Sequence, residues 1–386
     1  MFSKIKCSYD SNYIPIVVRE QNRITIKKAE ACSDVFEFKS ASSDGTSKAK
    51  LKVLRKLPTK WKDTFVANID HKFDFYPCDA VGILVPNPDE VVNELFELCG
   101  FEDMTVVIER VGISPFLFTG SIKDFIKYKL DLNTLPKKSL LMRLARNSSK
   151  NKELEYICSK TGTSDYLALG ENWTSLIDII REFECKPTLE DLLVNCELIK
   201  PRYYTILNSK GDILVGIVSK IVDNSLRLGH FSNFLCNLHS SSSGEAEVEI
   251  CLRKNKLCDK IPLDNLICFC TGTGIAPYIA FHNYLKDKLG PSQKTVYCGS
   301  TKLVYGFRND EDNILKYFEV DGPIVNVKSS NKDYVYDKIE TIQDCLPGCC
   351  VFICGNIRAQ KATFLKISEK LPILVQEKRI FFDSWQ

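Results

Sequence analysis

Apolar and polar residues alternate along the chain between residues 49 and 87. This period of two runs through Lys50–Leu54, Asp63–Ile69 and Asp74–Asn87, with turn residues between the runs. Every second side chain of a strand points to the same face, so alternation is typical of strands with one buried side. The pattern predicts antiparallel strands of a small barrel. One earlier strand is predicted at Ile14–Val18.

Between residues 88 and 199 the apolar residues recur every three or four positions instead, which is the helical period. This spacing predicts helices at Asp89–Cys99, Ser121–Lys129, Ser139–Arg146, Lys152–Thr161, Trp173–Phe183 and Thr188–Asn195. Thr188 lies three residues before Asp191, as in a helix N-cap. Strand-like alternation returns at Pro201–Asn208 and Asp212–Val222. The helices are therefore predicted to form an insert within the strand-rich domain, with a packing role.

From residue 263 onward, short apolar strands alternate with helical segments. The predicted strands are Leu266–Cys270, Thr295–Cys298, Ile324–Val327 and Cys350–Cys354. One predicted helix follows the first strand and ends near Lys288. Three more are predicted at Asn309–Phe318, Tyr334–Ile342 and Arg358–Glu369, and another before Arg379. Strand–helix alternation is typical of a doubly wound parallel sheet. The predicted fold class is thus a β-barrel plus α/β, in which an antiparallel barrel with a helical insert precedes a parallel-sheet domain.

Composition narrows the classes of partner and compartment. Lys and Arg number 52 and Asp and Glu 49, so the net charge of +3 predicts no nucleic-acid partner. No uncharged apolar run reaches the roughly 18 residues of a membrane span, and no signal peptide is apparent. The 17 cysteines are spread through apolar segments, which predicts a reduced, cytoplasmic protein. The densest group, at residues 345–354, lacks metal-site spacing, so no metal is predicted.

The turn Thr271–Gly274 joins an apolar strand to a helical segment. Glycines allow backbone N–H groups to approach phosphate oxygens, and a helix N-terminus carries partial positive charge. Only two glycines fall in the turn, so it is not the dinucleotide fingerprint with three. Taken alone, the turn fits either a phosphate site or a tight connection without a ligand.

Several short motifs occur in one order along the chain. They are Arg202-Tyr203-Tyr204-Thr205, Gly229-His230-Phe231-Ser232, Thr271–Pro277, Cys354-Gly355 and the terminal Asp383-Ser384-Trp385. The ordered set resembles the ferredoxin–NADP reductase-like half of the diflavin reductases, most of all the methionine synthase reductases. The resemblance covers roughly residues 50 to 385. It implies a tail or linker at 1–48, an FAD-binding FR-type barrel at 49–262 with a helical connecting insert at about 88–199, and an NAD(P)-binding domain with a flavin-shielding tail at 263–386.

The resemblance also implies roles for individual residues. A guanidinium grips a pyrophosphate bidentately, an aromatic ring stacks on isoalloxazine, and a hydroxyl reaches the flavin N5 edge. The implied FAD residues are Arg202, Tyr203, Tyr204, Thr205, Gly229, His230, Phe231, Ser232 and Trp385. The implied NADP residues are Gly272, Thr273, Gly274, Ser330, Asn331, Lys332, Tyr334 and Asn356. Thr205, Cys354 and Asp383 are the implied catalytic residues.

The chain departs from the family at two cationic positions. Asn331 stands where the family has an arginine, and Gly299-Ser300-Thr301 is aligned with the family's Gly-Cys-Arg. Losing both cations should weaken binding of a 2′-phosphate by about a few kcal/mol. NADPH is therefore an expectation that comes from the resemblance. The family's N-terminal flavodoxin, which carries FMN, has no counterpart in this sequence.

The resulting hypothesis is a flavoprotein that passes hydride from NADPH to FAD and then single electrons to a protein acceptor. By resemblance, the acceptor is a separate flavodoxin-like FMN protein or methionine synthase, whose cobalamin is reactivated by reduction. Two alternatives stay open. One is a general NAD(P)H diaphorase or a reductase of a heme or iron–sulfur partner. The other is a flavin-fold scaffold protein without turnover, because two cationic residues and the FMN module are missing.

Overall fold

A computed structural model describes most of the chain. The described residues are 11–16, 22–29, 36–40, 45–255, 261, 265–288, 301–345 and 348–383, without the side chains of 288 and 341–345. Within them, no helix is long and apolar enough to cross a membrane. The chain divides into two compact units. The first comprises Met1–Thr46, Leu84–Pro201 and Ser219–Phe234, and the second comprises Ser47–Ile83, Arg202–Val218 and Leu235–Gln386.

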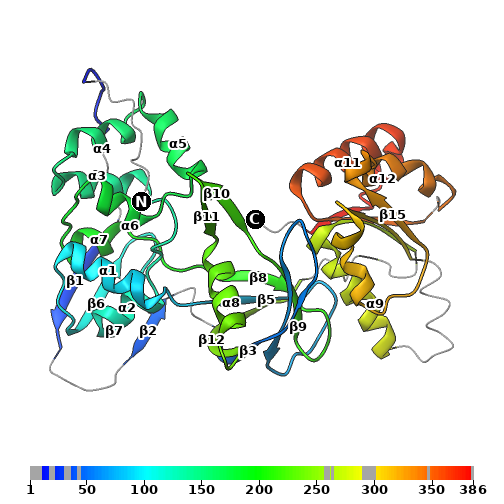
Figure 1. The fold of residues 1–386 in the computed structure, drawn as a ribbon, viewed down its shortest axis with the longest axis horizontal. Helices are drawn as coiled ribbons and strands as arrows, with labels where there is room; N and C mark the ends of the chain where they lie inside the picture. Colours follow the sequence, from blue (N-terminus) through cyan, green and yellow to red (C-terminus); the bar gives the residue numbers. More distant parts are fainter. Residues whose placement is uncertain are drawn as a thin grey trace. The chain divides into compact units, whose positions relative to one another are not determined.

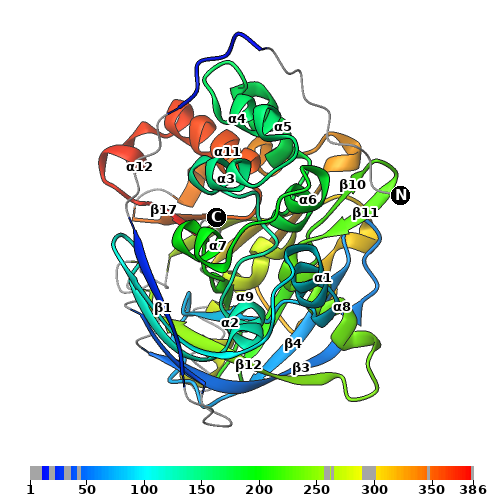
Figure 2. The same cartoon turned by 90° about the vertical axis from the view of Figure 1, so that its left-hand side faces the viewer.

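The first unit contains a four-stranded antiparallel sheet in the order β1-β6-β7-β2 (Figure 1, Figure 2). Its strands are β1 (Arg23–Lys28), β2 (Glu37–Ser40), β6 (Thr105–Val111) and β7 (Phe116–Ser121). Two of these strands lie in the segment that the sequence predicted as a tail. The strand predicted at residues 14–18 is not formed at 14–16, and residues 17–18 lie outside the described part. The predicted domain boundaries stay predictions.

Seven helices of the described chain belong to the first unit. They are α1 (Asp89–Cys99), α2 (Ile122–Tyr128), α3 (Lys138–Arg146), α4 (Asn151–Cys158), α5 (Thr163–Glu171), α6 (Leu176–Glu182) and α7 (Leu189–Asn195). Their apolar faces and one face of the sheet form a common core, which includes Phe118, Phe125 and Ile179. The Thr188 hydroxyl accepts a hydrogen bond from the Asp191 N–H, as the predicted N-cap requires. The unit also holds the hairpin of β10 (Ser219–Val222) and β11 (Ser225–Leu228).

The second unit begins with a six-stranded barrel in the order β8-β5-β12-β3-β4-β9. Its strands are β3 (Thr46–Leu57), β4 (Thr64–Asp70), β5 (Ala80–Leu84), β8 (Arg202–Thr205), β9 (Asp212–Gly216) and β12 (Glu245–Arg253). A bridge between Ile206 and Ile213 joins the two edge strands, β8 and β9. The strand pairs β3–β4, β4–β9 and β5–β8 are antiparallel. The helix α8 (His230–Ser240) precedes β12.

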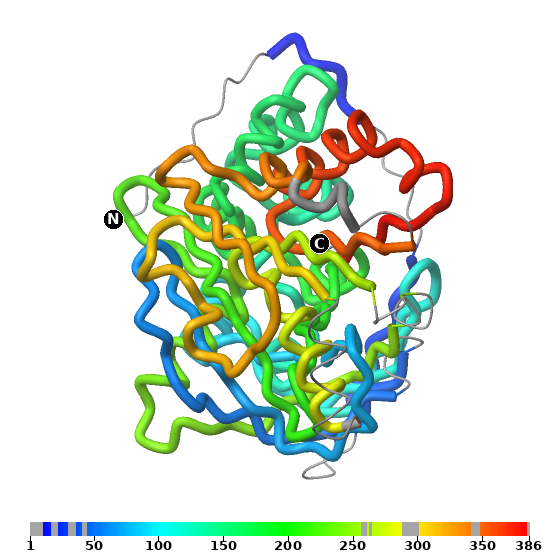
Figure 3. The backbone as a smooth tube through the Cα atoms, turned by 90° about the vertical axis from the view of Figure 1, so that its right-hand side faces the viewer, coloured from blue at the N-terminus to red at the C-terminus, as the bar shows by residue number. Residues whose placement is uncertain are grey.

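A five-stranded parallel sheet completes the second unit, in the order β15-β14-β13-β16-β17. Its strands are β13 (Leu266–Thr271), β14 (Lys302–Phe307), β15 (Ile324–Lys328), β16 (Cys350–Cys354) and β17 (Ile380–Asp383). The helix α9 (Ala276–Lys288) covers one face, and α11 (Ile357–Lys370) and α12 (Pro372–Gln376) cover the other (Figure 1, Figure 3). The predicted fold class, an antiparallel barrel followed by a doubly wound sheet, is therefore confirmed.

Two details of this domain differ from the sequence predictions. The strand predicted at 295–298 lies outside the described residues. On the side of β13 away from β16, the neighbouring strand is β14. The helices predicted at 309–318 and 334–342 are short 3₁₀ segments, η3 (Asp310–Asp312), η4 (Ile314–Tyr317) and η6 (Val335–Cys345). The Asn313 side chain accepts from the Leu315 N–H, 3.1 Å away. This bond caps the start of η4, so η3 and η4 are separate segments and not one continuous helix.

Candidate functional site

Two glycine-containing turns pack against each other at the carboxyl ends of β13 and β16. An added Cβ on Gly274 would lie 2.4 Å from the Gly355 Cα, and one on Gly355 would lie 2.1 Å from the Thr271 Oγ1. Gly355 also has a φ of +127°, which side chains other than glycine rarely adopt. The chain leaves β13 for one side of the sheet and reaches β16 on the other. This is the switch point where open α/β sheets bind ligands.

Side-chain hydrogen bonds fix the two turns. The Asn356 N–H donates to the Thr271 Oγ1 at 3.0 Å, and the Asn356 Oδ1 accepts from the Arg358 N–H at 2.8 Å, which caps α11. The Tyr305 hydroxyl donates to the Gly272 carbonyl at 3.3 Å. The buried Gln360 amide donates to the carbonyls of Gly355 and Asp383, at 2.9 and 3.2 Å. The turns thus form a rigid floor for a ligand.

A cleft of about 660 Å³ opens between this floor and the barrel, within the second unit. Eight of the residues predicted from the sequence line it. They are Tyr203, Tyr204, Thr205, Gly272, Thr273, Gly274, Tyr334 and Asn356. An added Cβ on Gly216 of the barrel would lie 3.0 Å from the Thr273 Cγ2, so the barrel closely approaches the turn. Residues that are far apart in sequence therefore share one concave surface.

Thr205 and Asp383 each have a buried side-chain oxygen that no described residue hydrogen-bonds. Their side chains are 3% and 4% exposed, and neither the Thr205 Oγ1 nor the Asp383 Oδ2 has a hydrogen-bond partner among the described residues. Burial raises the pKa of Asp383 to about 6, against the opposing charge of Arg253. Most buried polar groups in folded proteins are hydrogen-bonded, and exceptions with shifted pKa values gather at functional sites.

The third predicted catalytic residue, Cys354, ends β16. The strand register places Cys354 opposite Asp383 of β17 on one side and opposite Cys270 of β13 on the other. Cys354 is 1% exposed and does not line the cleft. The structure therefore brings Cys354 and Asp383 together on adjacent strands, and it places Thr205 in the cleft itself.

The predicted flavin residues fall in both units. Arg202 is exposed, and the pKa of the Tyr204 hydroxyl is raised by burial. The Arg253 guanidinium carbon lies 4.6 Å from the centre of the Tyr203 ring. The segment Gly229–Ser232 belongs to the first unit and starts α8.

Within that segment, the His230 Nε2 contacts the Pro86 carbonyl oxygen at 3.0 Å, and Phe231 and Ser232 are buried. The Gly229 carbonyl accepts the first helical bond, from the Asn233 N–H, at 2.8 Å. The segment is thus a helix start, as predicted. Trp385, the predicted flavin shield, lies outside the described residues.

Three predicted nucleotide residues stand apart from the cleft lining. Ser330, Asn331 and Lys332 form an exposed turn after β15 and do not line the cleft. Tyr334, the next predicted residue along the chain, does line it. The Ser330 N–H donates to the Arg308 carbonyl at 3.2 Å. The turn is therefore held to the loop that follows β14.

A Gly-x-Arg sequence lies at the carboxyl end of β14. There the chain reads Gly306-Phe307-Arg308, and Arg308 lines the cleft. Thr301 precedes β14, and residues 299–300 lie outside the described part, as does the strand predicted at 295–298. A cation is thus present in the cleft that sequence reasoning did not name. The Gly-x-Arg spacing was the signal that could have found it.

Comparison with known proteins agrees with this geometry. Residues 46–213 match the family model of the FAD binding domain. The chain is 24% identical over 344 residues to the sulfite reductase [NADPH] flavoprotein alpha-component of Buchnera aphidicola, which covers 83% of this chain and 54% of that protein. It is 26% identical over 313 residues to human methionine synthase reductase, with 69% and 44% covered. Against human NADPH–cytochrome P450 reductase it is 25% identical over 334 residues, with 75% and 48% covered.

The chain is a relative of the diflavin reductases. It spans about half the length of the curated relatives it matches. The matched FAD-binding domain agrees with the FAD predicted from the sequence, and the names of two of these relatives agree with the predicted NADPH.

The residues of the cleft fit both groups expected in a diflavin reductase. The close packing of Gly274 and Gly355 brings the two turns together near the starts of α9 and α11, and helix starts favour phosphate. Thr205 lines the cleft and its Oγ1 has no hydrogen-bond partner among the described residues, so a ligand there can satisfy it. The Asp383 Oδ2 also lacks a partner within that part of the chain, but Asp383 does not line the cleft. Tyr203 and Tyr204 add aromatic surface to the lining.

Proposed function

We propose that this diflavin reductase relative is an FAD-dependent NADPH oxidoreductase that delivers electrons to a protein acceptor. The observation that carries the proposal is that the buried Thr205 Oγ1 and Asp383 Oδ2 have no hydrogen-bond partner within the described ranges, near the two packed glycine turns. Bound FAD supplies the redox chemistry, because it accepts a hydride from NADPH, leaving NADP⁺, and releases electrons one at a time. The chain binds, orients and shields the reacting groups.

The nucleotide is held by backbone and side-chain donors of the floor. Gly272, Thr273 and Gly274 present N–H groups to its diphosphate, and Asn356, which caps α11, binds the nucleotide from the other turn of the cleft. Tyr334 and the turn at 330–332 bind its adenosine end. Fixing both ends of the dinucleotide places its reactive ring against the barrel, and this positioning lowers the barrier to transfer.

The barrel and the sheet supply the groups at the reacting end. The Thr205 hydroxyl donates to the flavin, for which Arg202, Tyr203, Tyr204, Trp385 and the Gly229–Ser232 turn form the binding residues. Asp383 holds or releases a proton near neutral pH, because burial raises its pKa to about 6. Cys354 lies beside Asp383 in the sheet register, and we assign it to the same catalytic group.

The proposal also names the protein that accepts the electrons. Methionine synthase reductase is among the relatives, which supports transfer to a flavodoxin-like FMN protein or to methionine synthase, with a role in methionine biosynthesis. The P450 reductases among the relatives support a heme protein as the rival acceptor. We place the protein in the cytoplasm, since no disulfide joins the cysteines of the described residues.

The direct test is the visible absorbance spectrum of the purified protein, recorded without oxygen before and after NADPH. A flavin spectrum that bleaches with NADPH supports the proposal, and a parallel titration with NADH gives the preferred nucleotide. Absence of flavin after incubation with FAD contradicts the proposal and favours the scaffold alternative. Flavin that stays oxidised with both nucleotides contradicts the proposed nucleotide site and leaves the proposed FAD site standing.

The acceptor is tested by adding candidates to the reduced protein. Faster NADPH oxidation with a flavodoxin-like FMN protein, and methionine synthase reactivation that depends on it, support the first acceptor. Direct reduction of a heme protein at a comparable rate favours the rival. A Thr205→Ala variant serves as the control, because it retains the same surface but should transfer hydride slowly.

A further inference from the structure

Trp61 lies at the margin of the cleft and is 65% exposed, an unusual position for the largest apolar side chain. It belongs to the loop between β3 and β4. The Arg308 guanidinium carbon lies 3.3 Å from the centre of the Trp61 ring, and Arg308 also lines the cleft. The planar guanidinium therefore stacks on the indole, in a cation–π contact.

The loop that carries Trp61 is fixed by a buried carboxylate. Asp312 is 8% exposed, and its Oδ1 accepts hydrogen bonds from the backbone N–H groups of Lys60 and Trp61, at 2.9 and 2.7 Å. The Lys60 ammonium pairs with Glu311 at 2.8 Å. The backbone of Trp61 is thus tied to the segment that follows Arg308, which keeps indole and guanidinium in register.

The carboxylates that follow Arg308 in sequence are engaged elsewhere. Asp310 pairs with Lys328 at 2.6 Å, Glu311 pairs with Lys60, and Asp312 holds the loop backbone. No hydrogen bond or ion pair joins the Arg308 guanidinium to another residue in the described ranges. A guanidinium has five N–H donors along its edge, and stacking occupies only its face. Arg308 can therefore offer its edge to an anion in the cleft.

We propose that Trp61 is a positioning residue that holds the Arg308 guanidinium for a phosphate group of the nicotinamide dinucleotide. The inference rests on the proposed function, which places this dinucleotide in the cleft. The stacked pair supplies a fixed cation that the Asn331 position lacks. Trp61 limits the rotation of a long side chain, so less conformational entropy is lost when the phosphate binds. The phosphate is either the 2′-phosphate or the diphosphate, and two probes separate them.

The experiment measures binding by isothermal titration calorimetry, with 2′,5′-ADP and 5′-ADP as probes for the full chain carrying its flavin. Trp61→Ala should weaken binding about 10-fold, through loss of a desolvated cation–π contact and of positioning. Trp61→Phe keeps a ring face and should stay within about threefold of the parent. Loss with 2′,5′-ADP alone identifies the 2′-phosphate, which 5′-ADP lacks. Loss with 5′-ADP, with or without a loss for 2′,5′-ADP, identifies the diphosphate, because 2′,5′-ADP carries a single 5′-phosphate.

A double-mutant cycle separates positioning from damage to the loop. Trp61→Ala should add no further loss in the Arg308→Met background, because two residues that act together are not additive. Lys60→Ala, which changes the same loop without touching the ring, should bind both probes like the parent. In steady state, Trp61→Ala should raise the KM for NADPH and leave kcat unchanged.

Three results would overturn the inference. The first is that Trp61→Ala binds the probes like the parent. The second is that Trp61→Ala weakens binding as much in the Arg308→Met background as in the parent. The third is that Lys60→Ala weakens binding as much as Trp61→Ala does. Failure of the proposed function has a different signature, because then the flavin-loaded parent itself binds neither probe. A parent that binds and a Trp61→Ala variant that binds equally well refute the role of Trp61 alone.

Discussion

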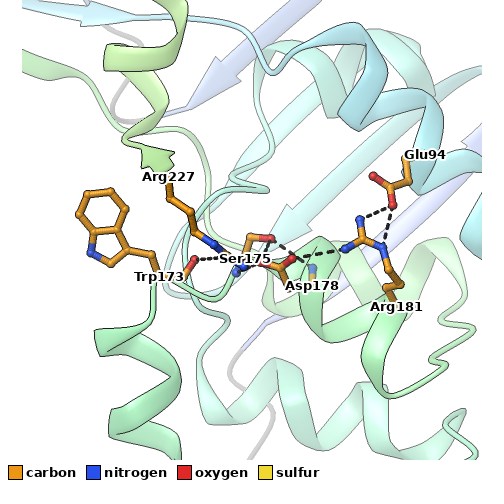
Figure 4. A network of polar contacts seen from close by, with 6 residues as sticks. All are labelled: Glu94, Trp173, Ser175, Asp178, Arg181 and Arg227. Carbon is orange, nitrogen blue, oxygen red and sulfur yellow. Dashed lines mark hydrogen bonds and ion pairs between the residues drawn. The ribbon is translucent and has the colours of Figure 1, made fainter. Parts of the chain in front are cut away.

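Two aspartates of this protein, a half-buried one in the first unit and a buried one in the second, differ in how their carboxylates are partnered. Asp178, in the first unit, accepts hydrogen bonds from the Ser175 N–H and hydroxyl at 2.9 and 2.8 Å, and from Arg227 at 2.9 Å. Arg181 joins Asp178 to Glu94 (Figure 4). Asp383, in the second unit, keeps one carboxyl oxygen without a hydrogen-bond partner in the part of the chain that the structure describes.

The contrast separates a structural carboxylate from a functional one. The bonds of Asp178 cap α6, and Arg227 brings β11 to the Trp173 carbonyl and to α6. Such a fully satisfied group stabilises the fold. A buried carboxyl without partners costs stability, so its presence requires a gain elsewhere, and we assign that gain to chemistry in the cleft. The two aspartates therefore make opposite predictions for mutation.

The largest expected effect is on stability, from Asp178→Ala. The change removes the capping box of α6 and leaves Arg181 and Arg227 with one partner fewer. We expect the free energy of unfolding to fall by about 4 kcal/mol, the sum of a cap and charge-assisted hydrogen bonds. Urea denaturation measures it. The KM for NADPH of the folded fraction should not change, and a loss of stability below about 1 kcal/mol would contradict the structural reading.

The pH dependence of the free energy of unfolding should reveal the raised pKa of Asp383. Its pKa in the folded chain is raised from 3.8 to about 6, so folding favours the protonated form. The resulting stabilisation is fully present below pH 3.8 and is lost as the pH rises through about 6. A shift of this size corresponds to about 3 kcal/mol. Asp383→Asn should gain this stability relative to the parent between pH 4 and 8, measured by urea denaturation without flavin; a constant difference would refute the shift.

Activity should respond to Asp383 in the opposite direction from stability. We expect Asp383→Asn to slow hydride transfer about 100-fold, or about 2.7 kcal/mol of barrier, because a positioned proton-exchanging group is removed. Rapid-mixing absorbance of the flavin measures the step, and the parent should show a titration near pH 6 that the variant lacks. A rate equal to that of the parent would sink the catalytic assignment.

The smallest effect is expected from Thr205→Val, which replaces the hydroxyl with a methyl of similar volume. The Thr205 Oγ1 has no partner among the described residues, so stability should change by less than about 1 kcal/mol. Hydride transfer should slow about 10-fold, or about 1.4 kcal/mol. Thr205→Ser, which restores the hydroxyl, is the matched control and should recover the rate. A large loss of stability would show that the hydroxyl has a structural partner.

The outline of the fold followed from local patterns in the sequence. Alternation predicted the strands of the barrel, and helical spacing predicted α1 and α7 with the Thr188 cap. The glycine turn at 272–274 was recognised because backbone conformation and residue type are linked at glycine. These features depend on neighbours in sequence, which a pattern can report.

The sequence failed where the deciding contacts are distant along the chain. Strand β1 pairs with β6, a partner about 80 residues away, and β17 exists because it adds to the edge of β16. The strand at Lys302–Phe307 was not predicted, and Arg308 at its carboxyl end was therefore not named. Pairing energies come from partners that a local window does not contain.

The sequence by itself determined the class of fold, the order of its motifs and the residue types available for chemistry. Only the tertiary structure decided which of those residues share a cleft, which polar atoms are buried without partners, and that Trp61 stacks on Arg308. The reason is physical. Backbone preference acts between neighbouring residues, whereas burial, pKa and ligand geometry depend on groups that folding brings together from distant segments.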